Sequence, residues 1–106
     1  AGFVSSALTN MDGTYIAGTS NLPSKDLSEP AAYCAKAVKA IVETLNTTKT
    51  GHYREALITT DTHYVIWRKL TDDIFLSLTV TIDQGNLGMA RLQMDQLSKK
   101  VIEELR

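Results

Sequence analysis

Three segments rich in β-branched and aromatic residues follow one another in the second half of the sequence, and the short gaps between them restrict the fold most. They run from Arg54 to Thr60, from His63 to Leu70 and from Ile74 to Ile82, with Asp61-Thr62 and Thr71-Asp72-Asp73 as the separators. Gaps of this length allow only hairpins, because parallel strands need a crossover of a dozen or more residues. The pattern therefore predicts an antiparallel three-stranded meander.

The start of the chain predicts one more hairpin. Phe3 to Met11 and Thr14 to Ser20 are rich in β-forming and small residues, and Asp12-Gly13 between them is typical of a tight turn. Asn21 to Leu27, which contains Pro23, has no periodicity and is expected to be a loop.

Two helices are predicted around the meander. The first runs from about Glu29 to Leu45 and ends near Asn46 to Thr48, with Ser28 as its N-cap and Pro30 in its first turn, and the second runs from Leu87 to Leu105 along one apolar stripe. The element order is ββαβββα, an α+β fold. Because 106 residues is close to the commonest domain size, we expect residues 1–106 to form one domain.

The apolar surface of the first helix is unusually wide. A central stripe is flanked by Ala31, Ala35 and Val42 on one side and by Tyr33 and Ala37 on the other, giving an arc of roughly 200° where a helix on one sheet needs little more than 100°. The stripe itself consists of Cys34, Val38, Ile41 and Leu45. A second copy of the chain would cover the excess, since two-fold homodimers dominate soluble oligomers. The alternative is that the alanines are simply good helix formers.

The composition argues for a protein partner. A net charge of −1 gives no bulk attraction to nucleic acid or to anionic membranes. Cys34 is the single cysteine, and no run approaches the roughly 20 apolar residues that cross a bilayer. The start of the chain also lacks a basic signal-peptide region. These features predict a cytoplasmic protein with no membrane or nucleic-acid partner.

Residues that could carry chemistry do not form a recognisable site. His52 and His63 lack any metal-ligand motif, Cys34 lies on the apolar side of a helix, and Asp72-Asp73 occupies a hairpin turn. Gly85 to Gly88 opens a helix without the spacing of a phosphate-binding loop, and Trp67 and Tyr64 have no basic patch beside them. We therefore predict no catalytic residue, no cofactor and no metal, hence no enzyme.

Two short motifs resemble those of the roadblock / dynein light chain family. Asp12 to Ala17 resembles the "D-G-x-x-I-A" hairpin, and Asn86 to Leu92 resembles the "N-x-G-x-x-R" entry to the last helix. The similarity extends from Phe3 to Leu105 and implies a profilin-like sandwich, with a five-stranded antiparallel sheet between helices. Family members carry an amphipathic helix before the first strand that this sequence lacks, and this departure from the family pattern leaves open whether the natural protein has one that precedes this sequence. Met89, Leu92 and Ile102, which lie off the stripe of the last helix, fit such a neighbour, another partner, or ordinary exposure.

The resemblance implies a homodimer, or a heterodimer with a paralogue, in which the strand from Arg54 to Thr60 pairs with its copy beside the first helix. Ala56, Leu57 and Ile58 give that strand little edge protection. The expected interface residues are Ala31, Ala35, Val38, Val42, Arg54, Ala56 and Ile58.

The family also implies an adaptor or regulator that binds a small Ras-like GTPase, with stimulation of GTP hydrolysis as a hypothesis. No residue stands out as an arginine finger, although Arg54, Arg68 and Arg91 are available. One alternative is a small-ligand sensor of the profilin, PAS or GAF type, which would need an internal cavity lined by a few polar groups. Another is an enzyme, which would need a cleft containing titratable groups of shifted pKa.

Overall fold

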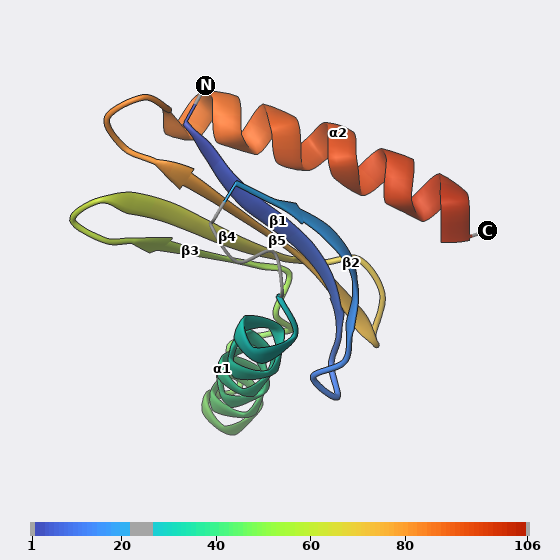
Figure 1. Ribbon diagram of the computed structural model, residues 1–106. Helices are drawn as coiled ribbons and strands as arrows, with labels where there is room; N and C mark the ends of the chain where they lie inside the picture. Colours follow the sequence, from blue (N-terminus) through green and yellow to red (C-terminus); the bar gives the residue numbers. More distant parts are fainter. Residues whose placement is uncertain (1, 22–26, 106) are drawn as a thin grey trace.

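The computed structural model describes residues 2–21 and 27–105 as a five-stranded antiparallel sheet with one helix on each face (Figure 1). The predicted α+β class and the order ββαβββα are confirmed. The bounds are β1 Phe3–Asn10, β2 Tyr15–Ser20, α1 Ser28–Thr48, β3 Glu55–Thr59, β4 His63–Lys69, β5 Ile74–Thr81 and α2 Leu87–Leu105.

The sheet joins the two predicted hairpin units through its middle strands. Its strand order is β2-β1-β5-β4-β3, so β1 of the first hairpin pairs with β5 of the meander, and Leu8 lies opposite Leu76. The two outer strands are therefore β2 and β3. Each has a neighbour on one side only within the described sheet.

Alternate residues of the central strands fill a separate core on each face of the sheet. Ile66 and Leu78 pack with Met94 of α2, whereas Trp67 and Phe75 pack with Val38 of α1. Phe75, Ile66 and Met94 are almost completely buried. Strands that are covered on both faces explain why the meander is apolar along its length rather than alternating.

The first helix begins differently from the prediction, whereas its last residue, Thr48, lies within the end expected near Asn46 to Thr48. Ser28 is its first residue, and the N-cap is Leu27, which makes no side-chain cap, so Ser28 is not the N-cap. Leu27 is buried, so packing of this residue fixes the start of the helix. At the other end Lys49 adopts a left-handed conformation with φ 55°, and the Thr50 N–H bonds to the carbonyl of Leu45. Of the predicted loop from 21 to 27, residues 22–26 lie outside the described part of the chain.

The two short motifs form the turn of the first hairpin and the start of α2. In the first hairpin the Asp12 carboxylate accepts the Thr14 N–H at 2.9 Å, and Gly13 has φ 98°, a conformation that favours glycine. At the start of α2 the Asn86 side chain accepts the Met89 N–H at 2.8 Å as a helix cap. Both motifs therefore have a structural role.

Candidate interaction surface

The edge strand β3 presents one row of backbone groups away from the sheet. The carbonyl of Arg54 accepts the Lys69 N–H at 2.9 Å, and the Thr60 N–H donates to His63 at 2.9 Å. Residues with even numbers therefore bond to β4. Because hydrogen-bonding direction alternates along a strand, the N–H and C=O groups of Glu55, Leu57 and Thr59 point outward.

The side chains of β3 divide between the two faces of the sheet. Ala56 pairs with Trp67 and Ile58 with Val65, both on the α1 face, while Leu57 pairs with Ile66 on the α2 face. Leu57 is 36% exposed and Ile58 is 37% exposed. The strand is thus apolar on both sides of an open backbone edge.

The one charged side chain of β3 is held inside the chain's own ion-pair network. Glu55 lies 2.6 Å from Nη2 of Arg68, which also bonds to Asp95 of α2, and Arg91 approaches the second Glu55 oxygen at 4.0 Å. Burial acts to lower the pKa of Arg68, but its hydrogen bonds to Asp95 and Glu55 outweigh this and raise it. The network ties β3 to β4 and α2 and leaves the strand edge without a free charge.

One flank of α1 continues this apolar edge. Ala32 lies against the turn of the first hairpin, since its Cα is 3.6 Å from where a side chain on Gly13 would begin. Cys34, about 200° around the helix from Ala32, lies beside Trp67 of β4, and its burial raises the pKa of the thiol. Ala37 and Ile41 share this side and are half-buried. We call Cys34, Ala37 and Ile41 the β3-side flank of α1.

The seven expected interface residues fall into two groups. Ala31, Ala35 and Val38 are buried under the chain's own sheet, with Ala35 only 2% exposed. The other four lie nearer the surface: Val42 and Ala56 are half-buried, and Arg54 and Ile58 are exposed. The structure brings Arg54, Ala56 and Ile58 together along one edge.

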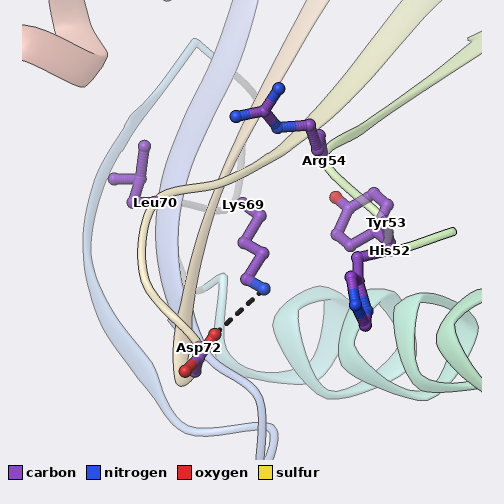
Figure 2. Close-up of a pocket in the computed structure, with 6 residues that line it drawn as sticks. All are labelled: His52, Tyr53, Arg54, Lys69, Leu70 and Asp72. Atoms are coloured by element: carbon purple, nitrogen blue, oxygen red, sulfur yellow. Dashed lines mark ion pairs between the residues drawn. The ribbon is translucent and has the colours of Figure 1, made fainter.

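A shallow cleft of about 680 Å³ lies at the end of this edge and is drawn in Figure 2. It is lined by His52, Tyr53, Arg54, Lys69, Leu70 and Asp72. The Tyr53 hydroxyl donates to the carbonyl of Trp67 at 2.6 Å, and Lys69 pairs with Asp72 at 3.0 Å. Burial raises the pKa of Tyr53, and the nearby Glu55 charge adds to this. The cleft therefore carries Arg54 and the Lys69–Asp72 ion pair next to the open strand.

The remaining chemical candidates stay apart from one another. His63 bonds to the neighbouring Thr62 hydroxyl at 2.7 Å, while Cys34 is half-buried on the side of α1 that packs on the sheet. Across residues 2–21 and 27–105, no group of three or more His, Cys, Asp or Glu could hold a metal ion. Within the same residues, neither helix is long and apolar enough to span a bilayer. Phe75, Leu78 and Met94 fill the space between sheet and helices where a sensor domain would hold its ligand.

A family model for the Roadblock/LC7 domain matches residues 1–94. The chain belongs to the Roadblock/LC7 family. No match is found among curated protein sequences.

Solved structures share this fold at low sequence identity. MglB of Myxococcus xanthus superposes with a TM-score of 0.87 at 14% identity, over 97% of this chain and 83% of that one. A Roadblock/LC7 domain from Streptomyces avermitilis gives 0.84 at 15% identity, over 99% and 87%. The gliding protein MglB of Thermus thermophilus gives 0.81 at 15%, over 96% and 77%.

The seven interface residues predicted from the sequence of this Roadblock/LC7 domain do not include Leu57 or the β3-side flank, which the structure adds as candidates. Ala31 and Ala37 lie on opposite sides of the same apolar arc, and their residue type does not reveal which side the sheet covers. For Leu57 a signal was available, since it is the middle residue of an unprotected strand.

Proposed function

We propose that this Roadblock/LC7 chain is a non-catalytic cytoplasmic adaptor that self-associates through β3 and the β3-side flank of α1, and that the resulting dimer binds a Ras-like small GTPase. The observation that carries the self-association is the open, uncharged edge of β3. An edge of this kind is a template for strand addition. The GTPase comes from the family resemblance.

Two structural neighbours support association with a copy or a paralogue. One is described as MglB with a tetrameric arrangement and superposes at a TM-score of 0.81 with 14% identity, over 96% of this chain and 76% of that one. MglC of Myxococcus xanthus superposes at 0.64 with 22% identity, over 97% and 87%. A chain that uses β3 and α1 for pairing still presents the opposite face to a GTPase, where Met89 and Leu92 of α2 are about half exposed.

The test compares two Ala→Glu variants of α1. Ala37→Glu places a charge on the β3-side flank and should shift the mass measured by light scattering from dimer to monomer, because an unpaired charge in an interface is costly. Ala32→Glu on the opposite flank is the matched control and should remain dimeric. Monomeric wild-type protein at micromolar concentration would overturn the self-association.

The GTPase is tested with the Ras-like protein encoded nearest this chain's gene. Wild type and Ala32→Glu should bind its GTP-loaded form and change its single-turnover hydrolysis rate, whereas Ala37→Glu should do so less. Binding without any change in the hydrolysis rate would support the adaptor role and would overturn the hypothesis that the chain regulates GTP hydrolysis. Failure of a confirmed dimer to bind the GTPase in either nucleotide state would overturn the partner.

A further inference from the structure

The free edge of β3 could pair with a second copy in several registers, and its backbone and side chains select one of them. This step rests on the self-association proposed above. We propose that Leu57 lies opposite Leu57 of the second copy, and that this register brings Asp61 of each chain toward Arg54 of the other. The two chains would then share one ten-stranded sheet with Leu57 at its two-fold axis.

The backbone limits the choice to registers that differ by two residues. Only Glu55, Leu57 and Thr59 have outward N–H and C=O groups, since the residues between them bond to β4. A slip of one residue would place an outward group opposite an inward one, and it would turn the side chains to the wrong face of the sheet. An allowed register also keeps the two α1 helices on the same face.

The side chains on the α2 face then favour the register centred on Leu57. This register pairs Glu55 of each chain with Thr59 of the other and uses every outward group of the strand. Sliding two residues toward the β3–β4 turn would place Glu55 opposite Asp61, which lies beyond the end of β3, and would leave only Leu57 and Thr59 with outward partners inside the strand. Sliding the other way would place Glu55 opposite Leu57 and leave Thr59 beyond the partner strand.

The α1 face fits the same register. Ala56 of each chain would lie opposite Ile58 of the other, in the pairs that are not hydrogen-bonded and whose side chains are closest. A small residue facing a large one fills this space without a gap or a clash. Ala37 and Ile41 of the two helices would cover these pairs from above.

The ends of the paired strands carry opposite charges. Arg54 is opposite Thr60 of the second copy in this register. Asp61, the next residue, lies beyond the end of β3 in the turn, where strand alternation no longer fixes its face, so its carboxylate can turn toward the long Arg54 side chain. Arg54 is exposed among the cleft residues that Figure 2 draws, where Lys69 pairs with Asp72, so the turn of the second copy would meet the Arg54 guanidinium. Two such contacts, one at each end, would fix the register.

A cysteine scan along the edge tests the register separately from the dimer. In a Cys34→Ala background, the single variants Ala56→Cys, Leu57→Cys and Ile58→Cys are oxidised and run on non-reducing gels. Leu57→Cys should cross-link at least about tenfold faster than the other two, because only this pair has Cα atoms within the roughly 4.4–6.8 Å that a disulfide spans. Ile16→Cys on the opposite edge is the control and should not cross-link.

The outcomes distinguish failure of the proposed register from failure of the proposed self-association. Faster cross-linking at position 56 or 58 in a dimeric background would overturn the Leu57 register and keep the dimer. A background that is monomeric by light scattering would overturn the proposed self-association itself.

A charge exchange tests the contact at the strand ends. Arg54→Asp and Asp61→Arg should each raise the dimer dissociation constant about tenfold, and the double variant should return it to near the wild-type value. Additive losses in the double variant would overturn the contact between Arg54 and Asp61.

Discussion

The two edges of the sheet, β2 and β3, differ in regularity rather than in hydrophobicity. β2 pairs with β1 through a register shift between Leu8 and Thr9 and contains Gly18, whose missing side chain would begin only 2.4 Å from the carbonyl of Ser6. β3 pairs with β4 without a shift. Bulges and local twist make an edge a poor template for pairing. The difference supports β3 rather than β2 as the edge for the proposed strand addition.

The charge on β3 strengthens this contrast. A charged residue on an edge strand normally protects it from pairing. Glu55 does not, because Arg68 and Arg91 hold its carboxylate against the chain's own α2 face. The internal ion-pair network therefore leaves the edge open, whereas β2 is protected by its geometry.

The largest expected effect on the dimer comes from a lysine at the centre of β3, compared with a lysine on the other edge strand, β2. Leu57→Lys would place two ammonium groups at the two-fold axis, and a loss of about 1.4 kcal/mol per copy would raise the dissociation constant at least about 100-fold. Ile16→Lys in β2 is the matched control, because Ile16 is 46% exposed and also lies on an edge strand. Its dissociation constant should stay within about threefold of wild type. Sedimentation over a concentration series measures both, and equal weakening by the two variants would remove the distinction between the edges.

A smaller effect is expected from freeing the Glu55 charge. Arg68→Met leaves Asp95 without its guanidinium and Glu55 with only the 4.0 Å approach of Arg91, and it should lower the free energy of unfolding by about 1–2 kcal/mol, since both carboxylates are partly solvated. It should also weaken the dimer about tenfold, because Glu55 then protects the edge.

One further variant tests whether the weakening of the dimer comes from charge, and another is a control for the loss of stability. Adding Glu55→Gln to Arg68→Met should restore the dimer. Lys69→Met removes the more exposed pair with Asp72 and should change the free energy of unfolding by less than about 0.5 kcal/mol in urea denaturation. A dimer that stays weak in the double variant would show that Arg68 acts through packing.

The sequence predicted the elements whose determinants are local. Gap lengths of two and three residues were enough for the meander, and the stripe of α2 gave its bounds of Leu87–Leu105, which the structure confirms. The start of α1 was not predictable in this way, because burial of Leu27 replaces a side-chain cap by Ser28. Tertiary packing here overrides a local preference.

The interaction surface was only partly predictable, because it depends on contacts between distant residues. Arg68 is 13 positions from Glu55 and 27 from Asp95, so the ion-pair network that neutralises Glu55 leaves no local pattern. The width of the apolar arc on α1 did indicate surplus surface, but only the position of Ala32 beside Gly13 shows which flank faces the first hairpin. Only the fold therefore shows that the sheet buries Ala31 and leaves Ala37 as the candidate for the interface.

The smallest expected effect concerns Tyr53, which anchors the start of β3, and it depends on pH. At pH 7 Tyr53→Phe loses the hydrogen bond to Trp67 and should lower the free energy of unfolding by about 0.5–1.5 kcal/mol. Because the pKa of Tyr53 is raised in the folded state, wild type loses stability as pH rises above about 10, where the unfolded tyrosine ionises. The variant has no such loss, so the difference should shrink by about 1.4 kcal/mol per pH unit above 10 and vanish near pH 11. Urea titrations in the Leu57→Lys background avoid any contribution from the dimer, and a constant difference from pH 7 to 11 would show that this hydroxyl does not stay protonated in the folded chain.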